Sequence, residues 1–294
     1  MTCHNRVEKT LGCLDALMKN ALPPGTSLEV FLVDDNSSDG TGRSVSERFP
    51  DVTVLKGGGS LFWNGGMRLA FEHVARRDFD FHLWLNDDTH LSPDAIERLV
   101  ATEEQVRQRV GMPVIIVGTT QDPKTGKATY GGQRRRGRWR LLQLDVVQAG
   151  SAPQRCDTFN GNCALVPREI YRALGNLDAT FRHAMGDTDY GFRANKAGFG
   201  IWAMPGFAGT CVIDHTRHQT YLDVELPLRE RFRRMFQPKG LPPRAWLTLT
   251  RRHCGPLWPA YFLWPYGKVI VTWVLRALRR QPAPTGGAAS SRRN

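Results

Sequence analysis

The feature that most constrains the fold is an alternation, over the first 120 residues, of short apolar runs with stretches of helical spacing. Four apolar runs have the length of buried strands and lie at residues 28–33, 52–55, 81–85 and 114–117. Residues 7–18 and 66–77 have helical spacing, and Ser92-Pro93-Asp94 opens another helix with Pro in its first turn. This alternation predicts an α/β fold with a mostly parallel central sheet flanked by helices.

After residue 120 the alternation loosens, and elements of other kinds are expected. Residues 129–147 are expected to form a hairpin that carries the arginine-rich run 134–140. Helices are expected at 167–174 and 189–197, and the chain beyond residue 223 is helical and basic in character. We predict a main domain, a helical basic C-terminal extension and a disordered tail rich in Pro, Gly, Ala and Ser, at residues 1–220, 221–280 and 281–294.

Two acidic loops follow predicted strands. Asp34-Asp35 ends the first strand and Asp87-Asp88 ends the third, and ligands of such sheets bind beyond the carboxyl ends of the strands. Adjacent carboxylates repel each other unless a cation offsets them, and a hard divalent metal that also binds phosphate oxygens does so. The alternative for Asp87-Asp88 is a solvated turn with a helix cap. For Asp34-Asp35 it is a strand-to-helix turn with Ser38 or Asp39 as cap.

A third acidic motif, Gly186-Asp187-Thr188-Asp189-Tyr190-Gly191, precedes a helical run. A carboxylate at the start of a helix stays ionised at neutral pH, so Asp187 is a candidate general base for an attacking hydroxyl. The alternative is a structural one, in which Asp187 caps the helix and interacts with its dipole.

The net charge of +12 indicates attraction to polyanions: nucleic acid, an anionic membrane surface, a phosphorylated substrate or a nucleotide diphosphate. The basic runs lie late in the chain, at 134–140, 229–234 and 276–280. The apolar stretch 256–275 contains three prolines, a glycine and a lysine, so it makes a poor membrane-spanning helix. It is expected either to lie on a membrane surface or to pack as a C-terminal helix.

The cysteine pattern indicates a reducing compartment. Six cysteines are scattered without a CxxC pair, which is typical of reduced thiols in the cytosol, and no signal peptide precedes the first expected element. We expect a cytoplasmic protein that can lie at the inner face of the cytoplasmic membrane.

The acidic motifs occur in a fixed order with a loop at the start of the chain. The series is Thr2-Cys3-His4-Asn5-Arg6, then Val33 to Thr41, then Leu85-Asn86-Asp87-Asp88, then Gly186 to Arg193. This ordered series resembles the family 2 glycosyltransferases, which have the Rossmann-like GT-A fold. The resemblance covers about residues 1–215, and the ordered set is more specific than any one motif.

The resemblance implies a nucleotide-sugar site. The positions expected to bind the donor are Thr2, His4, Arg6, Asp34, Asp35, Asn64, Asp87 and Gly161. Among them, Thr2 and His4 match the loop that meets the nucleotide base. Asp35 matches the carboxylate that recognises the base, and Gly161 matches a glycine loop under the donor sugar or the acceptor.

The resemblance also implies a metal site and a catalytic base. Asp87 and Asp88 match the metal motif, with Asp88 as the direct ligand of a Mn²⁺ or Mg²⁺ ion that bridges the donor diphosphate. His215 stands where many GT-A enzymes have a further metal ligand, and Asp187 matches the base of inverting members.

The sequence departs from the family pattern in two places. Members usually begin with an apolar strand, whereas Met1 directly precedes the Thr-x-x-Asn-Arg loop here, so we expect the true start to lie upstream. The loop 57–66, with Leu61-Phe62-Trp63-Asn64, differs from the commoner Asn-x-Gly form and resembles a bacterial subgroup associated with cell-envelope sugars.

The expected function is metal-dependent, inverting transfer of a sugar from a nucleotide-diphosphate donor to a hydroxyl of a glycan or a lipid-linked glycan. A sugar-phosphate nucleotidyltransferase is an alternative, but its usual glycine-rich, basic N-terminal loop is absent. A non-catalytic nucleic-acid-binding protein would fit the charge but not the ordered acidic motifs, so we expect no nucleic-acid partner.

Overall fold

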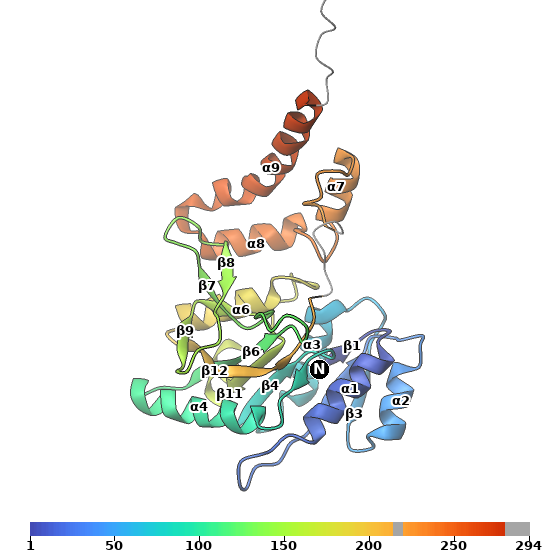
Figure 1. The fold of residues 1–294 in the computed structure, drawn as a ribbon, viewed down its shortest axis with the longest axis vertical. Helices are drawn as coiled ribbons and strands as arrows, with labels where there is room; N and C mark the ends of the chain where they lie inside the picture. The colour runs from blue at the N-terminus through green and yellow to red at the C-terminus, as the bar shows by residue number, and fades with distance from the viewer. Residues whose placement is uncertain (214–219, 280–294) are drawn as a thin grey trace, which may run out of the picture.

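The computed structural model describes residues 1–213 and 220–279. An α/β body forms one end of the molecule, and the C-terminal helices form the other end (Figure 1). His215 and the expected tail 281–294 lie outside the described residues, so the structure does not test either prediction.

The first 60 residues build a small parallel sheet in the order β1-β2-β3. Its strands are β1 (Thr2–Cys3), β2 (Phe31–Asp34) and β3 (Thr53–Lys56). The helices α1 (Val7–Met18), α2 (Thr41–Arg48) and α3 (Phe62–Val74) follow the three strands in turn. In this topology β2 ends at the Asp34-Asp35 loop, and β1 ends beside it because Cys3 pairs with Asp34.

A larger mixed sheet has the order β4-β11-β6-β12-β5, and β9 also pairs with β12. Its strands are β4 (Phe81–Leu85), β5 (His90–Leu91), β6 (Val114–Gln121), β9 (Gln154–Cys156), β11 (Cys163–Pro167) and β12 (Gly200–Thr210). The strands β6 and β12 run parallel, whereas β11 is antiparallel to both of its neighbours. The expected α/β fold is confirmed. The strands β5 and β9 also run antiparallel to β12, so the parallel pairs are those of the β1-β2-β3 sheet and of β6 with β12.

Helices cover this sheet, and a hairpin rises from it. The helices are α4 (Ala95–Val110), α5 (Arg168–Leu174) and α6 (Gly186–Lys196). The expected hairpin is present as β7 (Gly132–Arg135) and β8 (Leu144–Val146), with β10 (Thr158–Phe159) paired to the other side of β7. The arginine-rich run therefore occupies the end of β7 and the hairpin loop.

The C-terminal region is helical, as expected. Its elements are α7 (Leu228–Met235), α8 (Pro243–His253), the short 3-10 helix η2 (Gly255–Leu257) and α9 (Trp258–Arg279). Phe181 from the main body packs with Trp246 and Leu249 of α8 in a separate apolar cluster. Within the described ranges, no helix is both long and apolar enough to cross a membrane. The predicted domain boundaries remain predictions.

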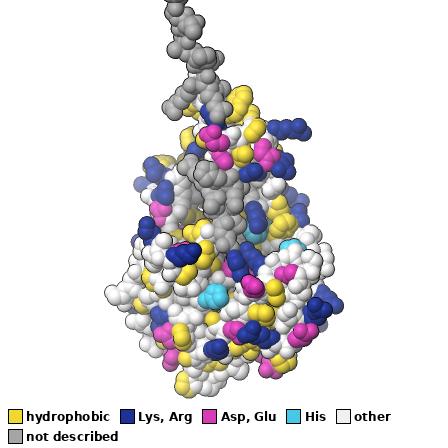
Figure 2. All heavy atoms as spheres, turned by 45° about the vertical axis from the view of Figure 1, so that its right-hand side comes forward, with side chains coloured by type: hydrophobic (Ala, Val, Ile, Leu, Met, Phe, Trp, Pro, Cys, Tyr) yellow, Lys and Arg dark blue, Asp and Glu magenta, His cyan; other side chains and the backbone are white. Residues whose placement is uncertain are grey.

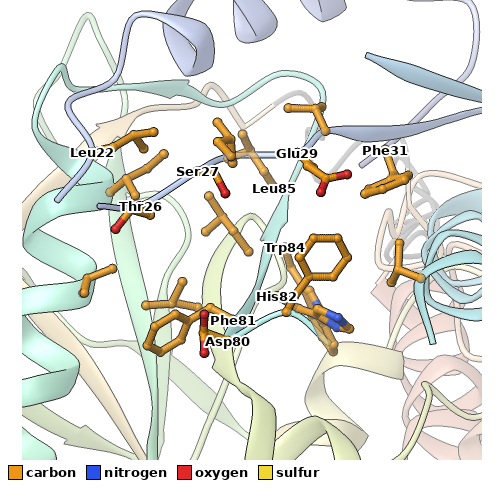
Figure 3. A pocket seen from close by; sticks show the side chains of 18 of the residues that line it. Leu22, Thr26, Ser27, Glu29, Phe31, Asp80, Phe81, His82, Trp84 and Leu85 are labelled. Carbon is orange, nitrogen blue, oxygen red and sulfur yellow. The ribbon is translucent and has the colours of Figure 1, made fainter. Parts of the chain in front are cut away.

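A cavity of about 690 Å³ is lined by the start of β2 and by the whole length of β4. Phe31, Phe81 and Leu85 line it together with the chain before β2 (Figure 3). The Asp34-Asp35 and Asp87-Asp88 motifs follow the carboxyl ends of the same two strands and are not among the residues that line this cavity.

Candidate functional site

Two loops that are far apart in the sequence interlock at the carboxyl ends of β1 and β2. The Asn5 side-chain oxygen accepts the backbone N–H of Ser38 at 2.7 Å, and the Asn5 N–H donates to the Ser37 hydroxyl at 3.0 Å. The His4 ring nitrogen Nδ1 lies 2.8 Å from the carbonyl oxygen of Asp35. The Thr-x-x-Asn-Arg loop is thus held against the acidic loop that follows β2.

Asp39 has the capping role that the sequence offered as an alternative. Its carboxylate accepts the N–H of Thr41, the first residue of α2, at 3.0 Å and the N–H of Val7, the first residue of α1, at 3.1 Å. One side chain therefore fixes the starts of two helices, because each first turn has N–H groups without a partner inside the helix.

The buried Asp35 carboxylate organises the glycine-rich loop. It accepts the backbone N–H groups of Gly59 at 2.7 Å, Leu61 at 2.8 Å and Phe62 at 3.2 Å. Asp34 accepts the N–H of Ser37 at 3.0 Å and closes the turn after β2. Both acids thus hold the backbone of the neighbouring loops in place, and their direct contact with a nucleotide base stays a prediction.

The second acidic pair is bridged by an arginine. One Arg6 guanidinium nitrogen donates to Asp87 at 3.2 Å and to Asp88 at 2.8 Å. Burial is the main cause that raises the pKa of Asp87 to about 6; Arg6 opposes this shift and the Asp88 carboxylate adds to it. Two adjacent carboxylates thus share one positive charge, and the pair keeps a surplus of negative charge.

This surplus and the oxygen ligands fit a hard divalent cation, which prefers carboxylate, water and phosphate oxygens. The second Asp88 oxygen accepts the Cys211 thiol at 3.5 Å. Among the described residues, no three His, Cys, Asp or Glu side chains gather closely enough to hold a metal by themselves. The role of Asp88 as a metal ligand therefore stays a prediction.

Asp187 lies in the first turn of α6, which begins at Gly186, three residues earlier than expected. Its two oxygens accept the N–H of Gly161 at 2.9 Å and the N–H of Thr188 at 2.7 Å. Burial raises the pKa of Asp187 above the usual aspartate range, while these two donors act in the opposite direction. The Asp187 carboxylate therefore contacts Gly161, the glycine that the sequence places under the donor sugar or the acceptor.

Trp63 joins these parts, and sequence reasoning assigned it no role. Its indole N–H donates to the Asn86 side chain at 2.6 Å, directly before the acidic pair. A methyl group added to Gly161 would lie 2.3 Å from a Trp63 ring carbon, so the ring lies flush against the glycine loop. A buried indole N–H usually finds a hydrogen-bond partner, so the aromatic residue in the loop 57–66 was the sequence signal for this contact.

Two of the residues predicted to contact the donor have buried side chains. The Asn64 side chain is fully buried, and its amide donates to the carbonyls of Asp178 and Phe181. The Thr2 side chain is buried against Gly66 of α3. Since α3 begins at Phe62 and not at residue 66, Asn64 lies in its first turn. Contact of Asn64 and Thr2 with a donor stays a prediction.

Asp189 anchors the C-terminal helices to the site. Its buried carboxylate binds Arg193 of α6, at 2.9 Å, and also Arg252 and His253 of α8, at 3.1 and 2.9 Å. The hydrogen bond from His253 and the two guanidinium charges hold the pKa of Asp189 below its usual range against the effect of burial. Asp187 thus belongs to a helix whose first turn is tied to α8.

Comparison with known proteins places this arrangement in a family. The family described as "Glycosyltransferase like family 2" matches residues 1–237. Two curated relatives, both N-acetylglucosaminyl-diphospho-decaprenol L-rhamnosyltransferase, come from Mycobacterium tuberculosis strains CDC 1551 / Oshkosh and ATCC 25618 / H37Rv. Each is 23% identical over 223 residues, which is 67% of this chain and 69% of the relative.

Solved structures share the fold at low identity. The mannosyltransferase PcManGT from Pyrobaculum calidifontis, in complex with GDP-Man and Mn²⁺, has a TM-score of 0.53 and 15% identity, and the match covers 96% of this chain and 75% of that one. S. aureus TarS has a TM-score of 0.52 and 13% identity, with 85% of this chain and 41% of that chain covered.

The fold and the acidic edge of the sheet define a glycosyltransferase with the GT-A fold. The chain belongs to glycosyltransferase family 2, whose members use nucleotide-sugar donors. This assignment favours sugar transfer over the nucleotidyltransferase alternative.

Proposed function

We propose that this protein is an inverting glycosyltransferase that moves a sugar from a nucleoside-diphosphate donor to a hydroxyl of a lipid-linked diphosphate glycan. The observation that carries the proposal is the placement of Asp187, in the first turn of α6 and bonded to Gly161. Trp63 connects this glycine to Asn86, the residue before the acidic pair. In this proposal Trp63 links the catalytic base, Asp187, to the acidic pair that would bind the diphosphate.

The reaction is a single displacement. The acceptor oxygen attacks the anomeric carbon while its proton passes to an Asp187 carboxylate oxygen, and the bond from that carbon to the diphosphate oxygen breaks. Attack on the face opposite the leaving group inverts the configuration, through an oxocarbenium-like transition state. Arg6, which lies against both acidic residues, is positioned to meet the charge of the departing diphosphate.

A divalent metal fits the same edge. Asp88 would hold it, with His215 as the expected second ligand outside the described residues. When bound, Mn²⁺ or Mg²⁺ neutralises diphosphate charge and so improves the leaving group.

The acceptor class follows from the curated relatives. Their printed name gives N-acetylglucosaminyl-diphospho-decaprenol as the acceptor. A related acceptor would place this protein in bacterial cell-envelope polysaccharide synthesis, at the inner face of the cytoplasmic membrane. The basic C-terminal region would be its contact with that membrane.

A panel of nucleotide sugars tests the proposal, with thermal stability measured for each with and without Mn²⁺ or Mg²⁺. A metal-dependent rise in Tm with one donor is expected, because a ligand that binds only the folded state stabilises it. The selected donor is then incubated with a lipid-diphosphate acceptor, and the anomeric configuration of the product is read by NMR. A retained configuration, or no shift with any donor, contradicts the proposal.

A further inference from the structure

The helix α9 is apolar on the side that faces away from the body. Leu263 and Trp264 are 62% and 66% exposed, and Val271 and Leu278 are 56% and 58% exposed. These positions recur at helical spacing and lie on one side of the helix. A helix that is apolar all round belongs in a protein core or against lipid.

The opposite side of α9 is already occupied. The Phe262 carbonyl accepts the Trp246 indole N–H of α8 at 3.1 Å, and the Val269 carbonyl accepts the Arg231 guanidinium of α7 at 3.2 Å. Within the described chain the inner side thus packs on α7 and α8, while the outer side lies at the end of the molecule in Figure 1. The outer apolar side chains therefore do not take part in the packing of α9 on α7 and α8.

The hairpin loop between β7 and β8 extends this surface. The Tyr261 hydroxyl of α9 donates to the carbonyl of Trp139, so the two segments are in contact although 122 residues separate them. The Trp139 side chain is 71% exposed and is flanked by Arg138 and Arg140. Figure 1 shows this hairpin reaching the start of α9.

The surroundings of α9 are strongly basic. Residues 220–279 contain eleven Lys and Arg residues against three Asp and Glu residues. Two of these acids are already paired, Glu230 with Arg233 and Arg234, and Glu225 with Arg276. Figure 2 shows hydrophobic and basic side chains intermixed at this end of the molecule.

We infer that the hairpin loop and the outer side of α9 form one surface that binds an anionic phospholipid membrane. We call it the hairpin–α9 face and define it by Trp139, Leu263, Trp264, Val271, Val274 and Leu278. Indole rings and aliphatic side chains bordered by arginine are the composition of protein surfaces that lie in the headgroup region of a bilayer. The inference deepens the proposed function by naming the partner surface.

A second copy of the chain is the competing occupant, and charge disfavours it. Pairing two hairpin–α9 faces would bring like basic borders together, and like charges opposed across an interface weaken association. A phospholipid surface supplies phosphate groups to the same arginines, and each basic residue near an anionic surface strengthens binding by about fivefold. The charge pattern therefore fits lipid.

Vesicle flotation tests this inference, with the full chain and neither donor nor acceptor present, so the result is independent of whether sugar transfer occurs. The protein is expected to float with vesicles of phosphatidylcholine mixed with phosphatidylglycerol, and much less with phosphatidylcholine alone. The double variant Leu263→Ala/Trp264→Ala is expected to bind at least about tenfold more weakly, because two large apolar side chains no longer enter the bilayer. Trp139→Ala is expected to weaken binding as well.

The matched control is Val110→Ala/Met112→Ala, which removes two exposed apolar side chains at the far end of α4. It should bind vesicles as the unmodified protein does, and circular dichroism should show every variant folded. No binding to anionic vesicles, or equal binding by the Leu263→Ala/Trp264→Ala variant, overturns the inference. Sedimentation that shows a dimer dispersed by Trp264→Ala, without vesicle binding, also overturns it and assigns the face to self-association.

Discussion

Replacement of Asp187 by Asn isolates the proton-accepting role of this side chain. The amide keeps the size of the carboxyl group and one acceptor oxygen, but it cannot take a proton from the acceptor hydroxyl. A positioned general base contributes about 10²- to 10⁴-fold to a rate, which corresponds to roughly 3–5 kcal/mol in the activation free energy. We expect kcat to fall by that factor while donor affinity stays unchanged.

The structure also sets the expected loss of stability. The two Asp187 oxygens each accept one backbone N–H, from Gly161 and Thr188, and Asn can satisfy only one of them. An N–H that loses its acceptor costs about 1–3 kcal/mol, against a total free energy of unfolding of about 5–15 kcal/mol for a typical domain. The variant should therefore remain folded, with a lower denaturant midpoint.

The assay compares turnover of the selected donor with calorimetric donor binding, for Asp187→Asn and for a matched control. Asp122→Asn is that control, because Asp122 also accepts two backbone N–H groups, from Lys124 and Thr125, in an exposed turn outside the site. Normal turnover by Asp187→Asn refutes the base assignment. Equal losses of turnover and of donor binding would mean that the substitution disturbs the pocket and not the chemistry.

The pH profile gives a second test of the same residue. Because burial raises the pKa of Asp187, its carboxylate takes up a proton at a higher pH than a free aspartate, for which the value is about 3.9. The protonated form cannot act as a base, so kcat/KM should decline on the acid side at a pH above that value. An acid limb that persists unchanged in Asp187→Asn would belong to another group.

Three further predictions concern other residues. Burial lowers the pKa of His82 to about 4, whereas the value in the unfolded chain is about 6.5. Between these two values unfolding takes up a proton, so the free energy of unfolding falls by up to about 1.4 kcal/mol for each unit by which the pH is lowered. His82→Phe keeps the stacking on Tyr171, and denaturant titrations at pH 7 and 5 should then differ less. Gly161→Ala pushes the Trp63 ring and should lower kcat/KM by about a hundredfold, whereas wild-type kinetics would count against the ring contact. Asp88→Ala should weaken Mn²⁺-dependent donor affinity by at least about tenfold, and unchanged calorimetric affinity would contradict its role as a ligand.

The sequence by itself determined the α/β class and the order of the motifs, because both depend on local properties. Hydrophobic periodicity located β4 at its observed bounds and α1 likewise, and turn residues located the acidic loops at the strand ends. The hairpin at 129–147 was predictable for the same reason. The antiparallel direction of β11 was not, because strand direction depends on the path of the chain and not on periodicity.

Only the tertiary structure decided which acids face the site and which support it. Asp35 and Asp189 resemble Asp87 in sequence, yet the first binds three loop N–H groups and the second binds Arg252 and His253. Such roles depend on partners 24 to 64 residues away, and no local pattern encodes them. The contact between the hairpin and α9 joins residues that are 122 positions apart in the sequence, so the surface they form together exists only once the chain has folded.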